Sequence, residues 1–295
     1  MSIGGRRWRW TATAALALVA VETPAETQVL RYVRYARGEQ VALGLLEGET
    51  IRELRGDLFA SPTPTGRTVR LADVKLLAPV DPARVSKVLG VAVNSKRPGR
   101  DTAIANPRWF AKLPTSINDP EGEIELPPEA ANLNYEGELV IVIGKRGRHI
   151  PRERALEHVF GYTVGNDVSE NTWYGERQGD REPTRLISKA ADTWAALGPV
   201  LVSGIDWRGL RVVTRLNGEV VNEGITDDLI NDVPNLVSYL SRYVTLLPGD
   251  LLYTGTYRYV PGTRRAFQAG DIVEVEIEKI GILRNRIVPM KVPAP

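Results

Sequence analysis

The feature that most constrains this chain is the run at residues 139–143, five consecutive apolar residues of which four are β-branched, closed by Gly144. A run of this length and composition predicts a buried strand. Two carboxylates, Glu136 and Glu138, stand at its start. Because residues two apart on a strand point to the same face, both side chains project together.

Two adjacent carboxylates repel each other unless a cation or a proton lies between them. A hard divalent cation with oxygen ligands, Mg²⁺ or a similar ion, is the natural solution. The alternative for such a Glu-x-Glu pair is an ordinary solvated strand face.

A third carboxylate is available downstream. Residues 151–160 predict a helix, because a proline suits the first turn, Glu153 favours the positive N-terminal dipole and Gly161 ends it. The next segment, 161–169, predicts a second strand that ends in a polar turn. Asp167 at this strand end is placed to complete the metal site.

Lys189 follows in the segment Ile187-Ser188-Lys189-Ala190. A cation beside a carboxylate–metal cluster can polarise a substrate carbonyl or stabilise an enolate. The alternative is a surface charge.

The order of these pieces resembles the fumarylacetoacetate hydrolase family: Tyr-Glu-Gly-Glu-Leu before a strand, Gly-Tyr-Thr-Val-Gly-Asn-Asp-Val-Ser after a helix, then Ser-Lys. The resemblance extends from about residue 30 to residue 288. It implies that Glu136, Glu138 and Asp167 bind Mg²⁺ (or Mn²⁺ or Ca²⁺) and that Lys189 is the active-site lysine. It also implies an α+β, β-rich fold, a mixed β-sheet roll with a small β-rich N-terminal domain, and a homodimer.

The chain departs from this family where relatives carry a catalytic histidine after an Asn-Tyr pair. It reads Asn94-Ser95-Lys96-Arg97-Pro98-Gly99-Arg100, and its only two histidines are His149 and His158. The chain is therefore expected to be a divergent member that lacks the usual histidine. Glu170 or a metal-bound hydroxide is the expected replacement for activating water.

Three segments supply the predicted substrate contacts. One resembles the family's Phe-x-Lys-Pro segment, the second stands where relatives carry a substrate-binding arginine and glutamine, and the third matches the family's Thr-Gly-Thr loop. The predicted residues are Trp109, Lys112, Asn171, Tyr174, Gly255, Thr256 and Tyr257.

The family's chemistry implies a 1,3-dicarbonyl or 2-oxo acid substrate that reacts through a metal-bound enolate. The expected reaction is C–C hydrolysis or decarboxylation. The first alternative is an isomerase or cyclase on a larger β-dicarbonyl compound, which needs no activated water; aromatic residues such as Trp173 and Tyr259 favour it. The second is a non-catalytic scaffold, which the cost of three unneutralised carboxylates opposes.

Composition sets the remaining expectations. The 295 residues are 43% hydrophobic with a net charge of +2, which favours a globular protein with a small-molecule partner and no nucleic acid. No cysteine is present, which excludes disulfides and thiolate catalysis. We predict an extension over 1–28, a small domain over 29–78 and a catalytic domain over 79–295. The extension has a weak signal-like outline too short to span a bilayer, so a cytoplasmic location without membrane attachment is expected.

Overall fold

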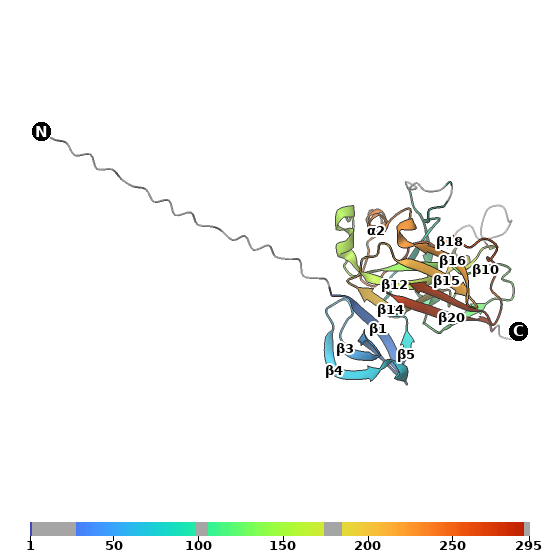
Figure 1. Cartoon of the computed structure of the whole chain (residues 1–295), viewed down its shortest axis with the longest axis horizontal. Helices are drawn as coiled ribbons and strands as arrows, with labels where there is room; N and C mark the ends of the chain where they lie inside the picture. The colour runs from blue at the N-terminus through green and yellow to red at the C-terminus, as the bar shows by residue number, and fades with distance from the viewer. Residues whose placement is uncertain (2–27, 98, 100–105, 174–184, 292–295) are drawn as a thin grey trace.

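The computed structural model of the chain describes residues 1, 28–97, 99, 106–173 and 185–291. Strands dominate the described residues, and Figure 1 shows the N-terminal strands, in blue and cyan, as a unit beside the main body. The first half contains β1 (Leu30–Arg37), β2 (Gln40–Glu47), β3 (Thr50–Arg55), β4 (Thr63–Arg70), β5 (Lys75–Leu77), β6 (Val88–Ala92), β7 (Arg108–Lys112), β8 (Ile117–Asn118), β9 (Glu123–Leu126), β10 (Leu133–Asn134) and β11 (Gly137–Ile143). The second half contains β12 (Val159–Asp167), β13 (Ser169–Glu170), β14 (Ala195–Ser203), β15 (Arg211–Leu216), β16 (Glu219–Ile225), β17 (Leu251–Tyr253), β18 (Arg258–Tyr259), β19 (Ile272–Ile277) and β20 (Gly281–Pro289).

Helices are few and short. The α-helices are α1 (Leu186–Ala190) and α2 (Val233–Ser241), and the 3-10 helices are η1 (Leu71–Asp73), η2 (Pro82–Arg84), η3 (Pro114–Ser116), η4 (Arg152–His158) and η6 (Thr226–Asp228). No helix in the described ranges is long and apolar enough to cross a membrane.

The strands form two large sheets. The larger runs β4-β3-β2-β1-β14-β12-β11-β17-β6-β7, with β5 added on β1 and β8 on β14, and the smaller runs β18-β16-β15-β19-β20-β9. Most neighbours are antiparallel, but β6 with β17, β8 with β14 and β9 with β20 are parallel. The predicted α+β, β-rich fold with a mixed sheet is therefore confirmed.

Strand β11 lies at the centre of this arrangement, between β12 and β17. Leu139, Ile141 and Ile143 belong to one hydrophobic core, which includes side chains of the smaller sheet. Val140 and Val142, which point the other way, belong to a second core. Because both faces are covered, the strand is apolar at consecutive positions rather than at alternate ones.

The N-terminal strands are joined to the main body by hydrogen bonds. Strand β1 pairs with β2 on one side and with β14 on the other, where Tyr32 lies opposite Leu201. The proposed division at residue 78 therefore falls just after β5, within one continuous sheet.

The predicted helix over 151–160 is wrong in type and in its end. The structure has the 3-10 helix η4 there, and strand β12 already begins at Val159. No side chain caps its N-terminus, and Ala155 is its only buried residue. Without a buried apolar face, the segment lacks the tertiary packing that supplies most of an α-helix's stability.

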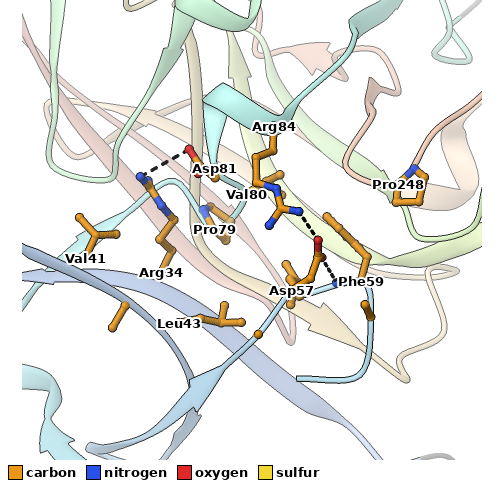
Figure 2. Close-up of a pocket in the computed structure, with 14 residues that line it drawn as sticks. Arg34, Val41, Leu43, Asp57, Phe59, Pro79, Val80, Asp81, Arg84 and Pro248 are labelled. Atoms are coloured by element: carbon orange, nitrogen blue, oxygen red, sulfur yellow. Dashed lines mark hydrogen bonds and ion pairs between the residues drawn. The ribbon is translucent and has the colours of Figure 1, made fainter. Parts of the chain in front are cut away.

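A hollow of about 440 Å³ lies where the N-terminal strands meet the segment that follows β5 (Figure 2). Arg34 pairs with Asp81 at 3.7 Å there, and Arg84 pairs with Asp57. None of its lining residues is a predicted metal ligand. The carboxylate cluster is elsewhere.

Candidate metal centre

The pairing of β11 with β12 creates the carboxylate cluster. Gly137 lies opposite Asn166, so the start of β11 meets the end of β12. The Asp167 amide donates to the Glu136 carbonyl at 2.9 Å, and the Glu136 amide donates to the Asn166 side-chain oxygen at 2.9 Å. Antiparallel pairing therefore brings together carboxylates that are about thirty residues apart in sequence.

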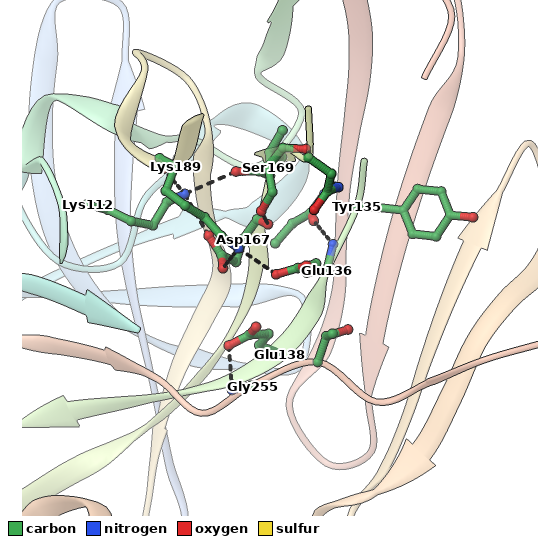
Figure 3. A network of polar contacts seen from close by, with 12 residues as sticks. Lys112, Tyr135, Glu136, Glu138, Asp167, Ser169, Lys189 and Gly255 are labelled. Atoms are coloured by element: carbon green, nitrogen blue, oxygen red, sulfur yellow. Dashed lines mark hydrogen bonds and ion pairs between the residues drawn. The ribbon is translucent and has the colours of Figure 1, made fainter. Parts of the chain in front are cut away.

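One carboxylate oxygen from each of Glu136, Glu138 and Asp167 lies within 4.8 Å of the others (Figure 3). The Asp167 side chain is fully buried, whereas that of Glu136 is 17% exposed. The cluster is therefore enclosed by protein but open on the Glu136 side.

Two lysines hold this cluster. The Lys189 ammonium donates to Glu136 Oε2 at 2.7 Å and to Asp167 Oδ2 at 2.5 Å. The Lys112 ammonium donates to Asp167 Oδ1 at 2.7 Å and also to the Lys189 carbonyl. The ring of Phe110 lies 4.6 Å from the Lys189 ammonium and fixes it from another side.

Burial and neighbouring charges shift the pKa values of Asp167 and Glu138 in opposite directions. Burial acts to raise the pKa of Asp167, but the ammonium groups of Lys112 and Lys189 outweigh it and hold that pKa below its usual value. The pKa of Glu138 is raised well above its usual value by burial and by the charges of Asp167 and Glu136. In the described part of the chain, the two lysines donate to Glu136 and Asp167 and not to Glu138, and a bound metal ion would supply the positive charge at Glu138.

Two glycines bring backbone close to this cluster. A Cβ at Gly137 would lie 2.2 Å from Thr214 Oγ1, so the residue between the two glutamates must be glycine. Gly255 has φ +103°, and its amide donates to Glu138 Oε2 at 2.7 Å. Gly255 thus orients a metal-ligand candidate.

A cavity of about 190 Å³ opens beside the cluster. Residues from several distant segments line it: Val91, Ala92, Val93, Ser95, Arg97, Glu136, Glu138, Asn171, Arg185, Lys189, Thr256, Tyr259 and Arg264. This cavity is the candidate substrate site.

Only some of the residues predicted to bind substrate line this cavity. Asn171 and Thr256 line the cavity. Tyr257 is fully buried and does not line the cavity, and Trp109 packs against the hydrophobic core. Tyr174 lies outside the described residues.

Lys112, predicted to contact substrate, has a fully buried side chain that donates to Asp167 and does not line the cavity. Lys112 in the structure supports a metal-ligand candidate. Removal of one partner from a buried ion pair typically costs about 3–5 kcal/mol. We expect Lys112→Met to lower the free energy of unfolding by about that amount in urea denaturation with EDTA present.

The matched control for this variant is Lys75→Met, because Lys75 is 62% exposed and lies 3.9 Å from its nearest acidic partner. The control should change stability by less than about 1 kcal/mol. Equal effects of the two substitutions would show that the buried ammonium does not support the cluster.

Glu170 is completely buried and lies away from the cavity. Its carboxylate accepts from the Asn132 amide at 2.7 Å and from the Thr172 amide and hydroxyl, each at 2.6 Å. These contacts fasten a loop, and they leave Glu170 poorly placed to activate water.

Neither histidine lines the cavity. His149 is exposed, and His158 Nδ1 lies 3.1 Å from the Lys145 carbonyl oxygen.

Sequence reasoning did not assign a site role to three arginines that line the cavity, Arg97, Arg185 and Arg264. They come from separate segments, and no common spacing or motif connects them. Tyr259, one of the aromatic residues taken to favour a larger pocket, lines the cavity, as Glu136 does.

The residues present fit a hard divalent cation. Such ions take oxygen ligands, and the cluster offers three carboxylates and no sulfur or imidazole. The three carboxylates face the two ammonium groups of Lys112 and Lys189, so the ionised cluster carries a net negative charge. Glu136, Glu138 and Asp167 would therefore hold the ion.

Comparisons with known proteins agree with this geometry. The family described as fumarylacetoacetate (FAA) hydrolase C-terminal matches residues 80–288, and the family described as Rv2993c-like, N-terminal, matches residues 30–79. Protein Rv2993c of Mycobacterium tuberculosis is 37% identical over 274 residues, covering 88% of this chain and 98% of the relative. The mitochondrial oxaloacetate tautomerase FAHD2A of Homo sapiens is 37% identical over 226 residues, covering 74% of this chain and 70% of the relative.

Among solved structures, that of 5-carboxymethyl-2-hydroxymuconate delta-isomerase from Mycobacterium smegmatis is similar with a TM-score of 0.79. It is 36% identical, and the alignment covers 88% of this chain and 100% of that one.

Proposed function

This chain belongs to the fumarylacetoacetate hydrolase family, and we propose that it is a divalent-metal-dependent enzyme that tautomerises or isomerises a 2-oxo acid. The observation that carries the proposal is the cavity in which Glu136, Glu138 and Lys189 meet without a histidine. Relatives named as an oxaloacetate tautomerase and an isomerase support this reaction class.

When bound, the cation supplies Lewis-acid polarisation of the 2-oxo acid oxygens. Lys189 supplies the protein's own positive charge at the same place. Burial alone would lower its pKa, but Asp167 and Glu136 raise the pKa above its usual value, so the side chain stays an ammonium. A fixed ammonium in an enclosed site stabilises an enolate oxygen as negative charge develops on it.

C–C hydrolysis and decarboxylation remain the competing reactions, and cyclisation of a larger β-dicarbonyl compound is a third. Hydrolysis needs a positioned base for water. Among the described lining residues the carboxylates are Glu136 and Glu138, which are metal-ligand candidates, and Glu170 lies elsewhere. This set favours proton transfer within the substrate over attack by water.

The test is the conversion of enol-oxaloacetate to the keto form, followed by ultraviolet absorbance with Mg²⁺ present. We expect acceleration above the rate with Mg²⁺ alone, loss of that acceleration with EDTA and its return with excess Mg²⁺. Chromatography of the products identifies the reaction. Cleavage of an acylpyruvate or release of CO₂ without tautomerisation would contradict the proposal and favour the hydrolase or decarboxylase.

Three finer points stay predictions. Mg²⁺ is proposed over Mn²⁺ and Ca²⁺ as the ion of the site. A homodimer and a cytoplasmic location are the expected assembly and compartment. Metal analysis of the purified protein tests the identity of the ion, and mass photometry tests the homodimer.

A further inference from the structure

Besides the carboxylate cluster, the wall of the cavity carries positively charged arginine side chains. Glu136, Glu138 and Lys189 line the cavity, and so do the guanidinium-bearing residues Arg97 and Arg264. A single cavity thus joins the proposed metal centre to these arginines.

Arg264 is held over an aromatic ring. Its guanidinium carbon lies 4.4 Å from the centre of the Tyr259 ring, and the Tyr259 hydroxyl donates to the Tyr135 carbonyl at 2.9 Å. In the described part of the chain, no carboxylate lies within ion-pair distance of Arg264. Stacking on a fixed ring positions the guanidinium and leaves its N–H groups able to donate.

Arg97 approaches from a different segment. Its Nη2 donates to the Tyr257 carbonyl at 3.3 Å, two residues before Tyr259. The pKa of Tyr259 is raised by burial and by Glu136 and is pulled down by Arg264 and Arg97. The Tyr259 ring therefore lies within electrostatic reach of the carboxylate cluster and of both guanidinium groups.

We propose that Arg264 and Arg97 bind the second carboxylate of a 2-oxo dicarboxylic acid. A planar guanidinium is suited to a carboxylate, since it can donate two parallel hydrogen bonds to it. The family resemblance places a substrate arginine near position 171, where this chain has Asn171. The positive charge for the far end of the substrate comes instead from the segments around 97 and 264. This inference rests on the proposed function, because the 2-oxo end must occupy the metal centre.

The test compares ligand pairs that differ only at the far end: 2-oxoglutarate with 2-oxopentanoate, and 2-oxoadipate with 2-oxohexanoate. Binding to the full-length protein with saturating Mg²⁺ is measured by isothermal titration calorimetry, which does not depend on turnover. We expect at least one dicarboxylate to bind about tenfold to hundredfold more tightly than its partner, the range of one or two charged hydrogen bonds.

Arg264→Gln should shrink this ratio to below about threefold and leave the affinity of the monocarboxylate unchanged. The matched control is Arg258→Gln, because Arg258 is exposed in strand β18, six residues before Arg264, and does not line the cavity. Arg97→Gln should act in the same direction as Arg264→Gln.

Equal affinities within both pairs for the unmodified protein would overturn the carboxylate site and leave the 2-oxo acid function standing. An equal loss of both ligands in Arg264→Gln would also overturn it, because the arginine would then support the cavity as a whole. Failure of all four ligands to bind with Mg²⁺ would overturn the proposed function together with this inference.

Discussion

Replacement of Glu138 by glutamine is expected to abolish both turnover and the stabilisation that Mg²⁺ gives. Glutamine keeps an oxygen for the Gly255 amide, which donates to Glu138 at 2.7 Å, so the local fold should persist. The charge that attracts the cation is removed. We expect the tautomerase rate to fall by about 10³-fold or more.

The stability measurement separates ligand loss from misfolding. In the unmodified protein, Mg²⁺ at 100 times its Kd should stabilise the fold by about 2.7 kcal/mol, seen as a rise in Tm. In Glu138→Gln this rise should vanish, while the Tm in EDTA stays equal or increases because a buried carboxylate is gone. Glu129→Gln is the control, since Glu129 is exposed and outside the cluster. If Glu138→Gln keeps both its turnover and its Mg²⁺-dependent rise in Tm, Glu138 is not a metal ligand.

Replacement of Lys189 by methionine is expected to lower turnover by about 10²- to 10³-fold, the usual effect of removing one group that stabilises a developing oxyanion. The stabilisation by Mg²⁺ should remain or increase. The reason is that the ammonium, which lies 2.7 Å from Glu136 and 2.5 Å from Asp167, no longer offsets the negative charge that attracts the cation.

The tautomerase assay measures the expected loss of turnover. Calorimetric titration of Mg²⁺ on the same preparation measures whether metal binding is retained. Lys145→Met serves as the control, because Lys145 is exposed and does not line the cavity. If Lys189→Met loses Mg²⁺ binding together with turnover, Lys189 is a structural support of the cluster and not the group that stabilises the enolate.

Strand alternation predicted that Glu136 and Glu138 project together, and the family resemblance implied Asp167 as the third member of the carboxylate cluster. Glu136 and Glu138 are two apart at a strand start, and the structure brings both within 4.8 Å of Asp167 as the pattern indicates. The β-rich fold was equally predictable, because runs such as residues 139–143 have no helical period. The family resemblance implied that these strands form a mixed β-sheet roll, an arrangement that hydrophobic periodicity alone does not specify.

Local sequence signals gave wrong or incomplete expectations where tertiary packing determined the conformation. Residues 151–160 have a good helix start and end, yet they form a 3-10 helix because only Ala155 is buried. Glu170 is adjacent to the site in sequence, yet its carboxylate turns to the Asn132 and Thr172 amides.

The sequence by itself determined that Glu136 and Glu138 project together, because the period of a strand places residues two apart on one face. The family resemblance, not the strand period, implied Asp167 as the third carboxylate. Only the tertiary structure decided what surrounds them. Lys112 reaches Asp167 across 55 residues of chain, and Arg97 reaches the Tyr257 carbonyl across 160. Such contacts depend on how separate segments pack, and no local pattern in the chain encodes the direction of a long side chain across that distance.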